Sequence, residues 1–158
     1  PHHSAANLTA RALRTAARSS LARPAIRLAH LGRAHVCPCC DSRLRRFAPH
    51  GLTPRPAARC PVCGALERHR LAWLYLCRET DLTNRRRKSL LHFAPEPQLT
   101  RLFRRIEGLA YLTADLASPR AAVHTDLTRL AVADASVDAV YCSHVLEHVP
   151  DDRRAMAE

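Results

Sequence analysis

The chain has 158 residues, 47% of them hydrophobic, which is enough for one domain or for a small module attached to part of a larger one. Its 25 Lys and Arg outnumber its 14 Asp and Glu by 11. No apolar run approaches the roughly 18 residues that a membrane span needs, so we exclude a transmembrane segment and expect a soluble or peripheral protein in the cytoplasm.

The positive charge is concentrated in residues 1–108, which hold 21 Lys and Arg against 6 Asp and Glu, whereas residues 109–158 hold 4 against 8. A basic region attracts nucleic acid, an anionic membrane surface or an acidic substrate. However, all the basic residues but Lys88 are Arg and Ala is the commonest residue, a composition that GC-rich codons also produce. We therefore favour a solvated, arginine-rich surface over specific nucleic-acid binding.

The ends of the chain indicate a fragment. Residues 1–36 contain no acid and mix Arg with Ala, Ser and Leu, which is also typical of a mitochondrial transit peptide. The first residue is Pro1 rather than Met, so this comparison is unreliable, and the chain stops at Glu158 inside an expected helix. We therefore treat the sequence as part of a longer protein.

The first half of the chain predicts helices on either side of a cysteine-rich stretch. Residues 5–33 predict one or two helices, broken near Pro24 because its ring removes a backbone donor. Residues 36–64 are rich in Cys, Pro and Arg, and residues 65–78 again have a helical pattern. The apolar faces of these helices would comprise Leu8, Leu13, Leu21, Ile26, Leu28 and Leu31, and then Leu66, Trp73, Leu74 and Cys77.

After Ser89, short apolar runs alternate with helical ones. The expected strands are 90–93, 109–113, 123–124 and 137–142. A helix is expected over 98–107, stopped by Gly108, and a last helix near Pro150. The first of these helices has one apolar face, formed by Leu99, Leu102, Phe103 and Ile106. Apolar strands alternating with helices predict a mostly parallel α/β sheet.

Four cysteines form two C-x₂-C pairs with nineteen residues between them, namely Cys37 with Cys40 and Cys60 with Cys63. Each pair can reach one metal ion from a tight turn, and two pairs complete the tetrahedral Cys₄ shell of structural zinc sites. Gly64 stands where the second turn must be sharp. Because all four ligands are cysteines, no coordination position remains for water, and we predict a structural Zn²⁺ rather than a catalytic one.

Other interpretations of the cysteines are weaker. Disulfides are disfavoured because nothing indicates a secreted chain, and a redox C-x-x-C is disfavoured because neither pair opens a helix in a clear βαβ unit. Cys39 lies between the ligands and could substitute for Cys40. Cys77 and Cys142 are expected to be small core residues.

His144, Glu147 and His148 form H-x-x-E-H, which matches the inverzincin pattern of metallopeptidases. That interpretation needs all three residues on one helix face and a further carboxylate ligand later in the chain. Here the motif directly follows an expected strand and ends at Pro150, so we do not favour it.

The longer stretch "DLTRLAVADASVDAVYCSHVLEHVPDDRRAM" resembles class I S-adenosylmethionine-dependent methyltransferases, in which an acidic strand end leads through a loop into the fourth strand and a "VLEHV" turn. Upstream, "YLTADL" is similar to the second strand of that family. The resemblance covers roughly residues 88–158. The cysteine pairs followed by "LERHR" look like the zinc-ribbon-like lead domain of some bacterial members.

The resemblance implies S-adenosylmethionine as cofactor, with Asp115 holding its ribose hydroxyls. The other residues that it implies for cofactor binding are His92, Ala94, Glu96, Asp126, Leu127 and Ser143. The candidate base for a proton of the acceptor is His144 or His148. These histidines could equally cap or pack the turn after the fourth strand.

The chain departs from the family at "HFAPEPQ", residues 92–98, where the family has an acid followed by a G-x-G-x-G loop. Ala94 is small enough to replace the first glycine, but Glu96 and Gln98 stand where the other two would be. Either a remodelled loop holds the cofactor, with Glu96 or His92 supplying a polar contact, or binding has been lost. We favour retention because Asp115, Asp126 and the "SHVLEH" turn persist.

These observations divide the chain into a basic helical lead segment (1–35), a zinc-ribbon-like module with its following helix (36–84), and the N-terminal half of a doubly wound, Rossmann-like methyltransferase domain (88–158). The predicted function is S-adenosylmethionine-dependent methyl transfer to an unknown acceptor, and the fragment alone is expected to be inactive. The alternative is a non-enzymatic zinc-knuckle protein that binds nucleic acid. That alternative explains the arginines but not the strands after Ser89.

Overall fold

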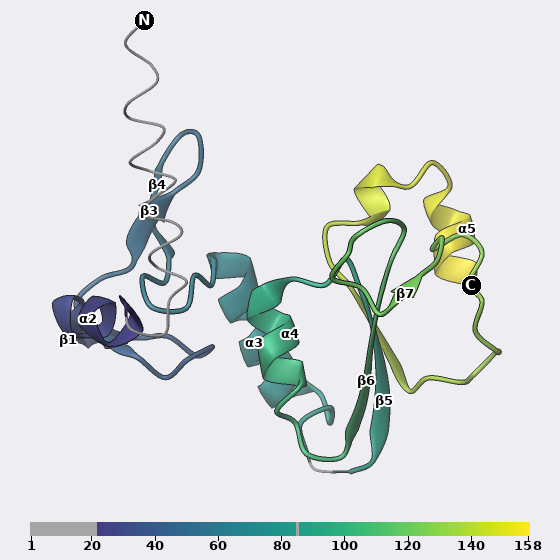
Figure 1. Ribbon diagram of the computed structural model, residues 1–158, viewed down its shortest axis with the longest axis horizontal. Helices are drawn as coiled ribbons and strands as arrows, with labels where there is room; N and C mark the ends of the chain where they lie inside the picture. Colours follow the sequence, from purple (N-terminus) through teal and green to yellow (C-terminus); the bar gives the residue numbers. More distant parts are fainter. Residues whose placement is uncertain (1–21, 85) are drawn as a thin grey trace, which may run out of the picture. The chain divides into compact units, whose positions relative to one another are not determined.

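The computed structural model describes residues 22–84 and 86–158 (Figure 1). They divide into two compact units between Trp73 and Leu74. The first part of the helical segment expected at 5–33, with Leu8, Leu13 and Leu21, lies outside the described residues. Among the described helices, none combines the length and the apolar character needed to cross a membrane.

The first unit contains two short antiparallel hairpins after a helix. Its elements are α2 (Ala22–Ala29), β1 (Leu31–Val36) paired with β2 (Arg43–Leu44), and β3 (Ala48–His50) paired with β4 (Arg55–Arg59). The prediction of helix as far as residue 33 is therefore wrong beyond Ala29. Gly is a poor helix former, and at Gly32 the strand runs so close to Arg45 that a side chain there would collide with the Arg45 backbone.

The helix α3 (Glu67–Glu79) confirms the helical pattern expected at residues 65–78. Thr80 follows it and donates its hydroxyl to the Leu76 carbonyl at 2.6 Å. Cys77 is exposed in the last turn, so the prediction that it is a core residue is wrong. Cys142, in contrast, is half-buried and packs against the core of the second unit.

The second unit is built on a four-stranded parallel sheet, as the sequence predicted. Its strands are β5 (Lys88–Phe93), β6 (Leu109–Asp115), β7 (Val123–His124) and β8 (Ala139–Cys142), in the order β7-β6-β5-β8. The chain runs outward from β5 to β6 and β7 and then returns to the other side of β5, so the strand order reverses there. In α/β sheets ligands bind at such a reversal, beyond the carboxyl ends of the strands.

Ser89 and Asp138 join the beginnings of β5 and β8. One carboxylate oxygen of Asp138, Oδ2, accepts hydrogen bonds from the backbone N–H and the hydroxyl of Ser89, each at 2.7 Å. These bonds hold the pKa of Asp138 below its usual range. They fix the register of two strands that are far apart in the chain.

Three short helical segments complete the unit: α4 (Pro97–Phe103), the 3₁₀ turn η1 (Leu146–His148) and α5 (Asp152–Ala157). The helix expected at 98–107 is shorter than predicted because it tightens at its end. The N–H groups of Arg105 and Ile106 bond to carbonyls three residues back rather than four. Gly108, with φ of +80°, then turns the chain into β6.

Both faces of β5 are buried, which explains its continuous apolar sequence. Leu91 and Phe93 lie on one face in a core cluster with Ala114, Leu127 and Ala155. On the other face, the ring of His92 contacts Phe103 of α4 edge-on. In Figure 1, β5 and β6 run side by side. The residues at the carboxyl end of β5 are therefore packed on both faces of the sheet.

Candidate metal and cofactor sites

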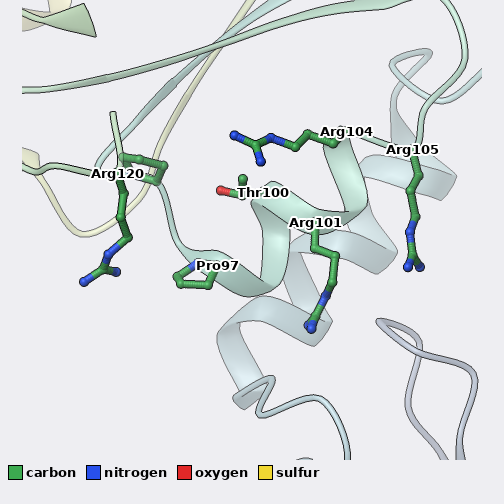
Figure 2. Close-up of a pocket in the computed structure, with 7 residues that line it drawn as sticks. Pro97, Thr100, Arg101, Arg104, Arg105 and Arg120 are labelled. Atoms are coloured by element: carbon green, nitrogen blue, oxygen red, sulfur yellow. The ribbon is translucent and has the colours of Figure 1, made fainter. Parts of the chain in front are cut away.

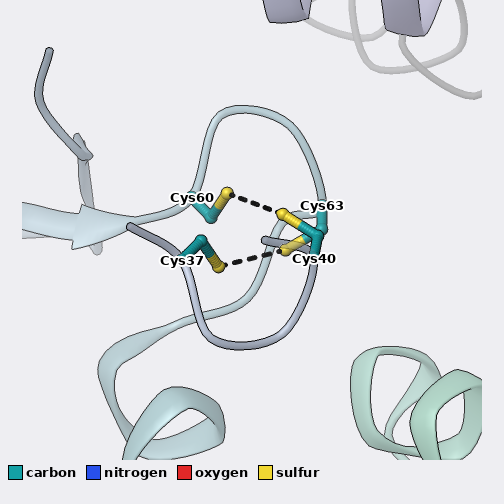
Figure 3. A group of neighbouring side chains, drawn as sticks. All are labelled: Cys37, Cys40, Cys60 and Cys63. Atoms are coloured by element: carbon teal, nitrogen blue, oxygen red, sulfur yellow. Dashed lines mark hydrogen bonds between the residues drawn. The ribbon is translucent and has the colours of Figure 1, made fainter. Parts of the chain in front are cut away.

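The four cysteines of the two C-x₂-C pairs come together in the first unit (Figure 3). Their sulfur atoms all lie within 4.8 Å of one another. The Sγ atoms of Cys37 and Cys63 are 3.7 Å apart, and those of Cys40 and Cys60 are 3.8 Å apart. The predicted ligand set is thus one cluster.

The backbone shapes each pair into a knuckle. The N–H of Asp41 donates to the Cys37 carbonyl at 2.8 Å, and the N–H of Gly64 donates to the Cys60 carbonyl at 2.9 Å. Both turns therefore span the same number of residues with the same hydrogen bond. This arrangement aims the two thiols of each pair toward one point.

The cluster fits a metal ion. Zinc–thiolate bonds of about 2.3 Å in a tetrahedron place the sulfurs roughly 3.8 Å apart. The Sγ distances from Cys37 to Cys63 and from Cys40 to Cys60, 3.7 and 3.8 Å, are close to this value. Hydrogen bonds with Cys39 and the other thiols raise the pKa of Cys37, and the hydrogen bond with Cys37 lowers the pKa of Cys40. Thiols this close cannot all lose their protons unless a cation compensates the charge.

Cys39 does not belong to this cluster. Its thiol donates to the His69 carbonyl at 3.7 Å, and the side chain is buried at 3% exposure. The sequence left open that Cys39 substitutes for Cys40. The structure places Cys40, not Cys39, beside the other three sulfurs.

In the second unit, the loop between β5 and α4 carries the first candidate cofactor residues. Ala94 has φ of +48°, in the left-handed region that favours glycine. For an alanine this conformation costs about 1–2 kcal/mol. The N–H of Ala94 donates to the Ala114 carbonyl at 3.0 Å, which continues the β5–β6 pairing into the loop. Backbone strain of this kind is common where a loop serves a ligand.

Asp115 ends β6, the strand next to this loop. One oxygen, Oδ1, accepts from the N–H groups of Ala117 and Ser118 at 2.9 and 2.8 Å. These bonds fix the carboxylate at the strand end and leave Oδ2 to accept from a ligand. Asp126, after β7, is fixed in a similar way, because Oδ1 accepts from the N–H and hydroxyl of Thr128. Those bonds lower the pKa of Asp126.

His92 was predicted to supply a polar contact to the cofactor, and its position contradicts this. Its side chain is fully buried, and its Nδ1 lies 2.7 Å from the Tyr111 hydroxyl. Tyr111 in turn donates to the Thr100 hydroxyl at 3.1 Å. Burial lowers the pKa of His92 to about 4, against an opposing attraction from Glu96. His92 is therefore a neutral packing residue beneath α4, and Glu96, half-buried at the start of α4, is the polar side chain of the loop.

Leu127 was also predicted to bind the cofactor. Its side chain is only 8% exposed and lies in the core cluster with Leu91 and Phe93. The same side chain also lines a pocket in this unit. Its role in cofactor binding therefore stays a prediction.

The turn after β8 holds Ser143 and the two candidate base residues. His144 has φ of +55° and its Nδ1 lies 3.1 Å from a carboxylate oxygen of Glu147. The backbone N–H of Glu147 and the bond with His144 lower the pKa of the Glu147 carboxyl. Glu147 and His148 lie in the 3₁₀ turn η1 and His144 precedes it. The H-x-x-E-H residues thus do not share one α-helix face, which argues against the peptidase interpretation.

One group of residues was not predicted from the sequence. Arg101 in α4, and Arg104 and Arg105, which directly follow α4, line a pocket with Arg120, which follows β6 (Figure 2). The spacing of Arg101, Arg104 and Arg105 was visible in the sequence. Arg120 lies in the same pocket because of the parallel crossover between the strands, and no local sequence pattern predicts this position.

The strand order, with a loop and two fixed carboxylates beyond the carboxyl ends of the strands, is that of a partial, doubly wound α/β domain. Residues 89–158 match the family model described as a methyltransferase domain. This match confirms the resemblance predicted for that part of the chain. No curated protein and no solved structure matches the chain significantly.

Proposed function

We propose that this protein transfers a methyl group from S-adenosylmethionine to an acceptor that neither the sequence nor the fold identifies. The observation that carries the proposal is the left-handed backbone of Ala94. It stands where the family has its first glycine, between β5 and α4. Ala57 and Ala135 share this conformation, each with φ of +55°, so the support for a ligand comes from the place of Ala94, at the carboxyl end of β5 where the strand order reverses.

The other residues at this edge of the sheet support the same site. The free oxygen of Asp115 is suited to accept hydrogen bonds from two neighbouring ribose hydroxyls. Glu96 offers a carboxylate at the start of α4, and Ser143 and Asp126 follow the ends of β8 and β7. S-adenosylmethionine would supply a methyl group on a positively charged sulfur, and the role of these residues is to bind and orient it.

His144 is the better of the two candidate bases. Glu147 lies beside its Nδ1, so the carboxylate orients the ring and favours the tautomer with a proton on Nδ1. The other ring nitrogen, Nε2, is then free to take a proton from an acceptor. His148 is exposed and, in the part of the chain that the structure describes, has no such carboxylate contact.

The cysteine cluster is proposed to hold one structural Zn²⁺. The support is the agreement between the sulfur spacing and a tetrahedral zinc–thiolate shell. The hairpins of this unit are short and mostly exposed, so the metal would supply much of the folding free energy. With four thiolate ligands the ion would have no open position for catalysis.

The cofactor proposal is tested by calorimetric titration of the full-length protein with S-adenosylmethionine and its demethylated product. Asp115→Ala should weaken binding about tenfold to one-hundredfold, because a hydrogen bond to a charged group contributes roughly 1.5–3 kcal/mol. Asp134→Ala is the matched control, since Asp134 is exposed in the loop before β8. The proposal fails if the unmodified protein binds neither compound at millimolar concentration, or if the two variants bind equally well.

A further inference from the structure

A pocket of about 550 Å³ lies beside α4 and the residues that flank it, within the size range of roughly 300–1,000 Å³ typical of ligand sites. Four of its seven lining residues are arginines. Arg101 comes from α4, Arg104 and Arg105 directly follow that helix, and Arg120 comes from the loop after β6. Two separate segments of the same unit therefore bring positive charge to one cavity.

Three of the four arginines are exposed, and Arg101, in α4, is half-buried. Leu99, Leu102 and Phe103 are buried, so the opposite side of the helix faces solvent. Arg104 and Arg105, like Arg120, are exposed. None of the ion pairs found among the described residues includes these three arginines. Their charges are permanent at neutral pH and repel one another across the pocket.

The directions of the side chains indicate the shape of the ligand. In Figure 2 the guanidinium groups of Arg101, Arg104 and Arg120 lie on different sides of Thr100 and point in different directions. One small anion could not contact all of them. An extended ligand with several anionic groups could, and guanidinium groups form paired hydrogen bonds with phosphate oxygens.

Thr100 adds a neutral donor to the pocket. Its hydroxyl oxygen accepts a hydrogen bond from Tyr111, so its own proton remains free to be donated to a ligand. Tyr111 is in turn fixed by His92 at 2.7 Å. His92 and Tyr111 together therefore orient the Thr100 hydroxyl.

The pocket is unsuited to S-adenosylmethionine. That cofactor carries two positive charges, on its sulfur and its amino group, and only one negative carboxylate. Four guanidinium groups would repel it more than attract it. The ligand of this pocket is therefore a different molecule from the cofactor assigned to the loop at Ala94.

We propose that the arginine pocket, formed by Arg101, Arg104, Arg105 and Arg120 with Thr100, binds a ligand that carries a chain of phosphate groups. Such a chain occurs in a small polyphosphate and in a nucleic-acid backbone, and the two share the chemistry that the pocket recognises. The proposal does not depend on methyl transfer.

The test uses the full-length protein at low ionic strength, with tripolyphosphate and a short single-stranded RNA as separate probes. Arg104→Gln and Arg120→Gln should each weaken binding about tenfold to one-hundredfold, as expected for the loss of a charge-assisted contact. Both arginines are exposed, so neither substitution should disturb folding. Arg153→Gln is the control, because it removes the same charge from an exposed position on α5 outside the pocket.

Binding of either probe that is weakened by the pocket substitutions and not by the control supports the proposal. Tripolyphosphate binding alone identifies a small ligand. RNA binding identifies a nucleic-acid backbone if the slope of log affinity against log salt concentration also falls by about one for each pocket arginine removed. If neither probe binds, or if Arg153→Gln weakens binding as much as Arg104→Gln, the pocket is not a phosphate site.

Discussion

Asp41 and Gly64 occupy equivalent positions in the two cysteine knuckles. Each directly follows the second cysteine of its pair, each has a positive φ, of 54° and 77° respectively, and each donates its N–H to the carbonyl of the first cysteine. Glycine adopts this conformation freely, and Asp is among the few other residues that tolerate it. The two knuckles are therefore the same turn, made with two different residues.

This equivalence predicts unequal effects of substitution. Gly64→Ala should destabilise the second knuckle by about 1–2 kcal/mol, because alanine is strained in the left-handed region. This loss of free energy should lower the affinity for zinc about tenfold. Asp41→Gly should be tolerated in the first knuckle, since it removes strain. Competition with a coloured zinc chelator measures both, and equal affinities for the two variants would contradict the shared geometry.

The metal content provides a second prediction. The purified protein should hold one equivalent of zinc, and Cys60→Ser should lose it and unfold the knuckles, because structural zinc supplies about 10–16 kcal/mol of apparent binding free energy. Cys39→Ser should retain the metal, since the Cys39 thiol bonds to the His69 carbonyl instead. Elemental analysis and circular dichroism of both variants give the result. Equal loss of metal from both would show that the ligand set is wrong.

Parallel buried strands are easy to predict because both faces are apolar, and "SLLHF" showed this directly. The knuckles were equally predictable, since four thiols at fixed spacing fit a metal site. The strand at Leu31 was missed because its pairing with Leu44 is set by a close approach at Gly32, which no local pattern shows. The sequence thus predicted the elements whose own residues carry a clear pattern. It failed where contact with a distant segment determines the local structure.

The candidate site shows the same limit. Asp115 was predictable because it ends an apolar strand. His92 was misassigned because its neighbour Tyr111, nineteen residues later, turns it into a buried partner rather than a ligand contact. The strained conformation of Ala94 had no signal in the sequence, where alanine indicated only a small side chain.

The conformation of Ala94 leads to a third prediction. Ala94→Gly should relieve about 1–2 kcal/mol of left-handed strain, offset by about 0.5–1 kcal/mol of added chain entropy. The melting temperature should therefore stay the same or rise, and affinity for S-adenosylmethionine should be kept. Ala94→Leu should weaken that affinity at least about tenfold, by adding bulk where the backbone approaches the ligand.

Calorimetric titration of both Ala94 variants, after thermal melting has shown that each is folded, separates the two effects. Lower stability with unchanged affinity in Ala94→Leu would mean that the loop is strained for packing reasons. The cofactor would then have to bind elsewhere on the domain.

The last prediction concerns the buried histidine. His92 has its pKa lowered to about 4 by burial, whereas in the unfolded chain it titrates near 6.5. Between these values the unfolded state binds more protons, so the stability that His92 contributes as a neutral ring is complete above about pH 6.5 and is lost as the pH falls toward 4. The loss should approach 1.4 kcal/mol per pH unit, the value for one proton.

Chemical denaturation of the full-length protein across this pH range measures the slope. His92→Phe keeps an aromatic ring against Phe103 and Tyr141, removes the titrating group, and should flatten the pH dependence by about one proton. His148→Gln, which removes an exposed histidine from the same unit, is the matched control, and its pH dependence should stay steeper than that of His92→Phe. If instead the nuclear magnetic resonance signal of the His92 ring titrates near 6.5 in the folded protein, the ring is accessible to water. The bonds from His92 through Tyr111 to Thr100 would then not form the buried network described here.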